Sequence, residues 1–145
     1  MAGGPPYEVE LLRGDYYELL GGVERWKIRT LVYPAMPPRS RSKGVHFGPR
    51  TDGKLYIGPS ASIAPDQTPK QVFVDAAQKF LPDVREGDLQ WAYAGIRPKY
   101  ESGDFVVRLD RAEPPLINLI GIDSPGLSAS MAIARYVARI LKGQS

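Results

Sequence analysis

Glycine and proline recur along the whole chain and leave few stretches long enough for a regular element. The 145 residues include 15 glycines and 14 prolines, and both residue types favour turns over the interiors of helices and strands. Short strands joined by turns fit this pattern, whereas a bundle of long helices does not. At this length we expect one domain with its own hydrophobic core.

Segments of β-prone residues, bounded by turn residues, occur along most of the sequence. They span residues 7–20, 28–33, 44–47, 54–57, 89–96, 104–109 and 116–122. Gly14 interrupts the first segment and predicts a bend there. The step from Asp52 to Gly53 tolerates the positive φ of a tight turn, so the segments on either side are expected to form a β-hairpin. The last segment is almost continuously apolar, which is typical of a central strand.

Two further segments have the spacing of amphipathic helices. Thr68 and Pro69 suit the N-cap and first position of a helix that ends before Pro82. Ser124 and Pro125 open a second helix in the same way. Its predicted core-facing residues are Leu127, Met131, Ala134, Val137, Ala138 and Leu141. Together the elements predict an α+β fold, with a mixed, largely antiparallel sheet of about six strands, one inserted helix and a C-terminal helix packed on one face.

The composition argues against several classes of function. The formal net charge is only +3, and aromatic residues do not alternate with basic ones as they do in nucleic-acid-binding patches. With no cysteine and one histidine, the chain offers no disulfide, no thiolate and no His or Cys metal site. No apolar run approaches the ~20 residues of a membrane helix. These features fit a cytoplasmic protein, and residues 1–6 are expected to be a leader outside the fold, native or added.

Arg97 and His46 are the candidate catalytic residues. Arg97 follows the small residues Ala94 and Gly95, which allow close backbone approach, and its planar guanidinium suits bidentate binding of a carboxylate. The alternative for Arg97 is an ion pair with a nearby aspartate at the end of a strand. His46 lies between two apolar residues of a predicted strand, where an imidazole can act as a general base. The alternative is a half-buried histidine with structural hydrogen bonds.

Two tyrosines and the start of the last helix are candidate binding groups. Tyr16 and Tyr17 face opposite sides of their strand, so at most one points into a pocket while the other packs. Ser124, Pro125 and Gly126 lie at the helix start, where backbone N–H groups without a helical partner favour negative charge. Such a terminus is an anion site, and it also suits the negative charge of a reduced flavin.

Several motifs occur in an order that is found in one enzyme family. They are Leu12-Arg-Gly-Asp-Tyr-Tyr-Glu-Leu19, Leu31-Val-Tyr-Pro34, Gly44-Val-His-Phe47, Gly53-Lys-Leu-Tyr-Ile-Gly-Pro59, Tyr93-Ala-Gly-Ile-Arg-Pro-Lys99, Asp104-Phe105 and Asn118-Leu-Ile-Gly-Ile-Asp-Ser-Pro-Gly-Leu-Ser-Ala-Ser130. From about Val9 to Leu141 the sequence thereby resembles L-2-hydroxyglutarate dehydrogenases and oxidases. These enzymes belong to the D-amino-acid-oxidase-like FAD-dependent superfamily.

The resemblance implies a role for each candidate residue. Arg97 would bind the substrate carboxylate, and His46 would act as a base or as a partner of the substrate hydroxyl. Tyr16 or Tyr17, together with Lys99, would line the substrate pocket. The residues that would contact FAD are Gly95, Ser124, Pro125, Gly126 and Leu127.

The resemblance is to the later part of the family's chain. Family members begin with a Rossmann-like unit that carries a Gly-rich dinucleotide-binding turn, and this sequence lacks that fingerprint. Residues 7–145 would therefore form a substrate-binding domain plus the strand and helix that complete a flavin site. FAD is expected only when an N-terminal flavin-binding half completes the site.

Three functions remain open. The first is a fragment or split subunit of an FAD-dependent oxidoreductase that oxidises a small 2-hydroxy acid, similar to L-2-hydroxyglutarate, to the 2-oxo acid. Its partner would be a separate FAD-binding chain. The second is a non-catalytic remnant that binds a small carboxylate or a partner protein, or self-associates through an exposed final helix. The third is an oxidase of an amine or amino acid, because an arginine carboxylate site suits those substrates too.

Overall fold

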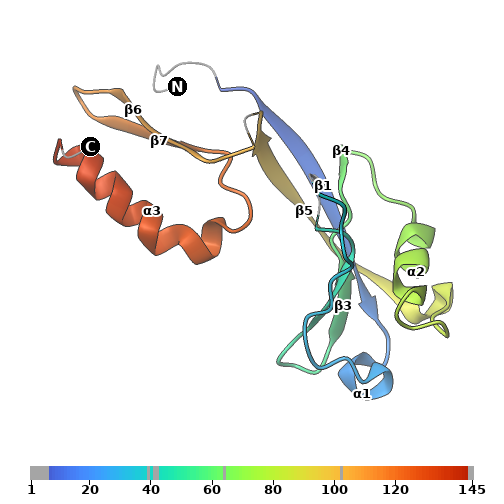
Figure 1. Cartoon of the computed structure of the whole chain (residues 1–145). Helices are drawn as coiled ribbons and strands as arrows, with labels where there is room; N and C mark the ends of the chain where they lie inside the picture. Colours follow the sequence, from blue (N-terminus) through green and yellow to red (C-terminus); the bar gives the residue numbers. More distant parts are fainter. Residues whose placement is uncertain (1–6, 39, 41–42, 64, 102, 144–145) are drawn as a thin grey trace. The chain divides into compact units, whose positions relative to one another are not determined.

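The computed structural model describes residues 7–38, 40, 43–63, 65–101 and 103–143, so the leader expected at residues 1–6 lies outside the described part. The chain groups into two compact units (Figure 1). The sheet unit is Leu12–Ile96, and the C-terminal unit combines Met1–Leu11 with Arg97–Ser145. Strands β1 (Val9–Leu19) and β5 (Leu89–Tyr100) each contribute residues to both units.

The sheet unit is built around β1. This strand pairs with β3 (Leu55–Gly58), β4 (Ser62–Ile63) and β5, while β2 (His46–Pro49) pairs with the outer side of β3. The β1–β3, β1–β4 and β2–β3 pairs are antiparallel, which confirms the predicted largely antiparallel sheet. β2 and β3 form the predicted hairpin, and Gly53 in its turn has φ +84°.

Two expectations about the strands of residues 7–33 are wrong. Gly14 does not divide the first segment into two strands, because β1 is continuous through it. A Cβ at Gly14 would lie 2.8 Å from the Pro59 Cβ, so the lack of a side chain lets Pro59 approach closely. Residues 28–33 form no strand, and among them Val32 alone makes a bridge, to Phe47. Pro34 follows directly and has no backbone N–H with which to continue a ladder.

The hydrophobic core of the sheet unit lies where helix α2 (Lys70–Gln78) packs against the strands. The core residues of α2 are Phe73, Val74 and Ala77, and those of the strands are Tyr17, Leu19, Phe47, Leu55, Ile57 and Leu89. Each fully buried side chain of this size contributes roughly 1.5–3 kcal/mol. Short connections complete the unit, a helix α1 (Gly22–Trp26) and a 3-10 turn η1 (Glu86–Asp88).

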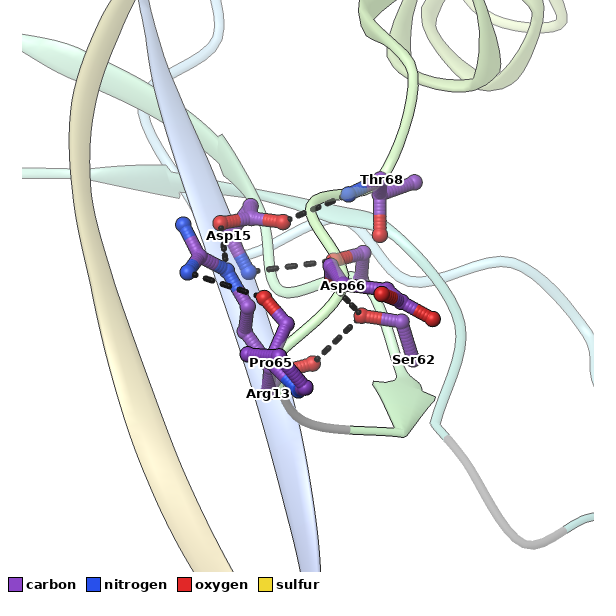
Figure 2. A network of polar contacts seen from close by, with 7 residues as sticks. Arg13, Asp15, Ser62, Pro65, Asp66 and Thr68 are labelled. Carbon is purple, nitrogen blue, oxygen red and sulfur yellow. Dashed lines mark hydrogen bonds and ion pairs between the residues drawn. The ribbon is translucent and has the colours of Figure 1, made fainter.

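A polar network fixes β1 against the segment between β4 and α2 (Figure 2). Asp15 is fully buried, and its carboxylate accepts hydrogen bonds from Arg13 Nε at 2.8 Å and from the Thr68 backbone amide at 2.9 Å. The Asp15 amide in turn donates to Ser60 Oγ at 3.0 Å. A buried carboxylate needs such partners because its desolvation is costly. Thr68, the predicted N-cap, does not cap α2: Pro69 is the N-cap residue and the helix begins at Lys70.

Besides the ends of β1 and β5, the C-terminal unit contains one hairpin and one helix. β6 (Val106–Arg111) and β7 (Leu116–Ile120) pair antiparallel as a sheet of their own, and helix α3 (Gly126–Leu141) contacts β6. Among the described strands β7 pairs with β6 alone, so the expectation of a central strand is wrong. Its apolar residues are half-buried for the most part, because one helix on a two-stranded sheet cannot cover both faces.

The packed face of α3 differs from the predicted one. Its less exposed residues recur at helical spacing and are Ala129, Ile133, Val137 and Ile140. Of the predicted core face, only Val137 belongs to this set. Leu127 is 92% exposed and Met131 is 74% exposed. The helix therefore has two apolar faces, and the one expected to pack is open to solvent.

Asp110 on β6 joins the hairpin to the start of the described chain. Its carboxylate accepts hydrogen bonds from the Tyr7 hydroxyl, from Arg108 Nε at 2.6 Å and from Asn118 Nδ2 at 2.7 Å. The hydrogen bond from Tyr7 is the main reason why the pKa of Asp110 lies below its ordinary value; burial opposes it, and Asn118 and Arg108 add to the lowering. The ionised carboxylate is thus the form that the fold stabilises.

Candidate functional site

Two predicted site residues, Tyr16 and His46, lie on the sheet face that points away from the core. The core side of the three neighbouring strands is marked by a row of register partners, which are Tyr17, Ile57 and Phe47. Side chains alternate along a strand, so the adjacent row faces the opposite way. That row has Gly58 on β3 as the register partner of His46 on β2, and Gly58 lies against Tyr16 on β1.

Gly58 lets the Tyr16 ring lie over the backbone of β3. Its φ is +145°, and a Cβ there would lie 2.8 Å from Tyr16 Cδ1 and 2.7 Å from the Asp15 carbonyl oxygen. The Tyr16 ring stacks on Tyr93 of β5 with 4.6 Å between ring centroids. Tyr93 is also 6.0 Å from the ring of Tyr56 on β3. Three tyrosines from three strands therefore cover this part of the sheet face.

His46 has contacts on two sides. Its Nδ1 lies 3.0 Å from the carbonyl oxygen of Gly44. Its ring stacks on Tyr33 with a centroid distance of 4.1 Å and an interplanar angle of 24°. The bridge between Val32 and Phe47 puts Tyr33 next to His46 across the strands. The imidazole is half-buried, so it is held in place without being sealed in the core.

Tyr17 and Gly95 have different surroundings. Tyr17 is 5% exposed and packs against the Phe73 ring at 4.7 Å, so it belongs to the core and not to the face that carries Tyr16. Gly95 is exposed on β5, and a Cβ there would meet no heavy atom of the described residues within 4 Å. Glycine at this position is therefore not required by the packing of the described chain.

Arg97 and Lys99 lie two residues apart on β5, in the part that belongs to the C-terminal unit. This spacing directs both side chains to the same side of the strand. Both residues are half-buried. The ion pairs of the described residues do not include Arg97, so the alternative of a nearby aspartate partner is not found there. A half-buried guanidinium outside the ion pairs of the described residues suits an anionic ligand.

The start of α3 has no side-chain cap. Pro125 is the N-cap residue, and the first turn contains no acidic residue. Ser124, the predicted cap, is exposed and precedes it. Gly126 is buried, and a Cβ there would lie 2.5 Å from Ile122 Cγ2, whereas Leu127 is 92% exposed. The Gly126 amide donates to the Asp123 carbonyl, so the amides that follow it in the first turn are the ones that can donate to a carbonyl or to an anion.

The predicted site residues thus divide between the two units. Those of the sheet unit are Tyr16, Tyr17, His46 and Gly95, and those of the C-terminal unit are Arg97, Lys99 and residues 124–127. Sequence reasoning assigned no site role to three residues that contact Tyr16 or His46, which are Tyr33, Gly58 and Tyr93. All three lie in the motifs that carry the family resemblance, and the register of the predicted hairpin was the signal that could have placed Gly58 beside His46.

The described part of the chain contains no group of three or more His, Cys, Asp or Glu residues that could hold a metal ion. No helix in the same part is long and apolar enough to cross a membrane.

Comparison with known proteins decides the family. The family model described as DAO, FAD dependent oxidoreductase, matches residues 1–140. The chain belongs to this family. The resemblance predicted from the sequence motifs is thereby confirmed, as is the relation to FAD-dependent enzymes.

The relatives within this family are named for two kinds of substrate. A mitochondrial L-2-hydroxyglutarate dehydrogenase of Arabidopsis thaliana is 32% identical over 87% of this chain and 30% of its own length. A glycerol 3-phosphate oxidase of Mycoplasma genitalium is 30% identical over 89% of this chain and 35% of its own. The chain spans about a third of the length of these relatives.

A solved structure has the same fold. It is the dithionite-reduced L-alpha-glycerophosphate oxidase from Mycoplasma pneumoniae with FAD bound, at 27% identity and a TM-score of 0.79. The match covers 97% of this chain and 38% of that one. The α+β fold class predicted from the sequence is therefore confirmed. The cytoplasmic location stays a prediction, since the name of the Arabidopsis relative places that protein in mitochondria.

Proposed function

We propose that this chain is the substrate-binding part of an FAD-dependent oxidoreductase that oxidises a 2-hydroxy acid, similar to L-2-hydroxyglutarate, to the 2-oxo acid. The observation that carries the proposal is the 32% identity to the Arabidopsis L-2-hydroxyglutarate dehydrogenase over 87% of the chain. A second relative with the same printed activity, from Caenorhabditis elegans, is 25% identical over 86% of the chain.

The start of α3 fits a flavin. It has no side-chain cap and no acidic residue in its first turn, and Leu127 there is 92% exposed. Such a terminus favours a ligand that carries partial or full negative charge. The flavin part of FAD would be held by Ser124, Pro125, Gly126 and Leu127. The lack of a side chain at Gly95 would allow the flavin to approach closely. When bound, FAD supplies the acceptor for the hydride that leaves the substrate α-carbon.

The chain's own residues would bind the substrate and move its proton. Arg97 would bind the carboxylate through two parallel N–H···O bonds, with Lys99 on the same side of the strand. His46 would accept the proton of the hydroxyl, and Tyr16 would contact the substrate beside it. Tyr17 is the less suitable member of the tyrosine pair, because it packs in the core.

A dinucleotide-binding half would complete the flavin site. The chain spans about a third of the length of its relatives, and its 145 residues contain no Gly-rich dinucleotide-binding turn. We propose that such a half, added as a separate FAD-binding chain, completes the flavin site.

The test is a visible absorbance spectrum of the purified chain, first alone and then with FAD and the remaining part of the Arabidopsis relative as a separate polypeptide. Addition of L-2-hydroxyglutarate without oxygen is expected to bleach the flavin band of the mixture. The Arg97→Lys variant should need at least about tenfold more L-2-hydroxyglutarate to bleach the flavin to the same extent. A tenfold change corresponds to about 1.4 kcal/mol of binding free energy. Arg29→Lys is the matched control, because that side chain is 70% exposed. A mixture that binds FAD and never bleaches with the acid would contradict the proposal.

Glycerol 3-phosphate is the second candidate substrate. It is favoured by the structural match to the Mycoplasma pneumoniae oxidase, with a TM-score of 0.79. The same mixture, treated with glycerol 3-phosphate in place of the hydroxy acid, separates the two candidates. If glycerol 3-phosphate bleaches the flavin and L-2-hydroxyglutarate does not, the ligand of Arg97 would be a phosphate instead of a carboxylate.

A non-catalytic role is favoured by the exposed apolar face of α3, where Met131 is 74% and Leu141 57% exposed. In that case the chain would self-associate or bind a partner protein through α3, and it would bind no flavin under any of these conditions. Sedimentation of the chain alone measures the self-association.

A further inference from the structure

His46 is the one histidine of the chain, and its contacts determine which ring nitrogen carries the proton. Nδ1 lies 3.0 Å from the Gly44 carbonyl oxygen. A carbonyl oxygen accepts hydrogen bonds and cannot donate them, so the proton of this contact belongs to Nδ1. A neutral imidazole has one N–H group, and Nε2 then carries the lone pair.

We infer that the Gly44 carbonyl and the Tyr33 ring hold His46 as the Nδ1–H tautomer, with Nε2 as the acceptor for the hydroxyl of a substrate. The tautomer follows from contacts within the sheet unit. The identity of the hydroxyl rests on the proposed function. Gly44 and Tyr33 are positioning residues, because each touches the imidazole and acts through it.

The contact between the Gly44 carbonyl and the imidazole depends on glycine at this position. Its φ is +75°, a backbone conformation that glycine adopts without strain. A Cβ at this position would lie 2.6 Å from Pro34 Cγ and 2.7 Å from Met36 Sδ. Any other residue would therefore clash with the preceding loop and move the carbonyl that meets the imidazole two residues later.

Tyr33 reaches the imidazole from a different segment. The Val32 amide donates to the Phe47 carbonyl at 3.2 Å, and the Phe47 amide donates to the Val32 carbonyl at 3.0 Å. This bridge fixes Tyr33 beside His46, where the rings stack at 4.1 Å. The stack restricts rotation of the imidazole about its side-chain bonds, so Nδ1 stays directed at the carbonyl.

A single histidine makes the test direct. The full chain is labelled with ¹⁵N at its imidazole nitrogens, and a long-range ¹H–¹⁵N correlation spectrum is recorded without FAD or substrate at pH of about 8.5, where an ordinary imidazole is neutral. We expect one set of ring signals with the proton on Nδ1. A spectrum with the proton on Nε2 would overturn the inference.

Variants separate positioning from general stability. Tyr33→Phe keeps the stack and is expected to keep the wild-type pattern, whereas Tyr33→Ala should give a mixture of both tautomers. Tyr33→Leu repeats the loss of the ring while retaining apolar cover, in case the alanine variant does not fold. Tyr136→Ala, at a similarly exposed tyrosine (49%) on α3, is the control and should leave the pattern unchanged. Wild-type signals in Tyr33→Leu would refute the role of Tyr33.

The outcome is independent of the flavin experiment. An Nδ1–H spectrum together with a mixture that never bleaches would keep the tautomer and reject the proposed substrate. Nε2–H with a bleaching mixture would keep the activity and remove Nε2 as the acceptor.

Discussion

Replacing Asp15 with asparagine is expected to destabilise the sheet unit by about 3 kcal/mol, as estimated from buried ion pairs and hydrogen bonds to charged groups. The carboxylate is fully buried and accepts hydrogen bonds from Arg13 Nε and from the Thr68 amide. Asparagine has one acceptor oxygen, so one of the two donors loses its partner. Loss of one member of a buried pair costs roughly 3–5 kcal/mol, and the 22% exposure of the Arg13 side chain places the estimate at the lower end.

The assay is urea unfolding followed by tryptophan fluorescence. Both tryptophans, Trp26 and Trp91, belong to the sheet unit, so the signal reports its unfolding. With a slope of roughly 2 kcal/mol per molar urea, the midpoint should fall by about 1.5 M. Glu18→Gln on the same strand is the control, since its pair with Lys54 is partly exposed and contributes little to stability. Equal midpoints for the two variants would refute the assignment of Asp15 as a buried anchor.

Three further changes test the packing. Thr68→Val removes a buried hydroxyl oxygen without a partner among the described residues, so unfolding free energy in urea should stay the same or rise by up to about 1 kcal/mol. Gly58→Ala should cost about 2–3 kcal/mol, and more than Gly53→Ala, where φ is also positive but no atom lies within 4 Å. The folded pKa of Asp110 is lowered by the Tyr7 hydrogen bond, so its contribution is present above the unfolded pKa and is lost as pH falls through the folded one. On acidification below pH of about 4, the free energy of unfolding of the Asp110→Asn variant should therefore fall less than that of the wild type.

The hairpin and α2 could be predicted from the sequence because their signals are local. The Asp52-Gly53 turn specifies the connection of β2 and β3, and Pro69 with Pro82 delimits the helix. Gly14 has no such local explanation: its neighbour is Pro59, which lies 45 residues later in the connection between β3 and β4. Sequence alone cannot distinguish a glycine that bends a strand from one that admits a distant backbone.

The candidate site was predictable in its residue types and not in its geometry. Alternation showed that Tyr16 and Tyr17 face opposite sides, but α2 had to be placed before Tyr17 could be assigned to the core. The role of His46 as a candidate base came from the sequence. Its tautomer depends on Gly44 and Tyr33, and the second of these reaches it through a bridge in a segment that was expected to be a full strand.

The error about α3 has a physical cause. A helix with one buried face needs one apolar stripe, and the sequence of α3 contains two. Ala129, Ile133, Val137 and Ile140 are the less exposed residues of α3, while Leu127, Met131 and Leu141 stay exposed. The residues of the exposed stripe are as apolar as those of the packed one, and burying each leucine or methionine would yield roughly 1.5–3 kcal/mol. Exposure of this apolar stripe to water costs free energy. The residues that misled the prediction therefore favour the packing of a second surface against α3.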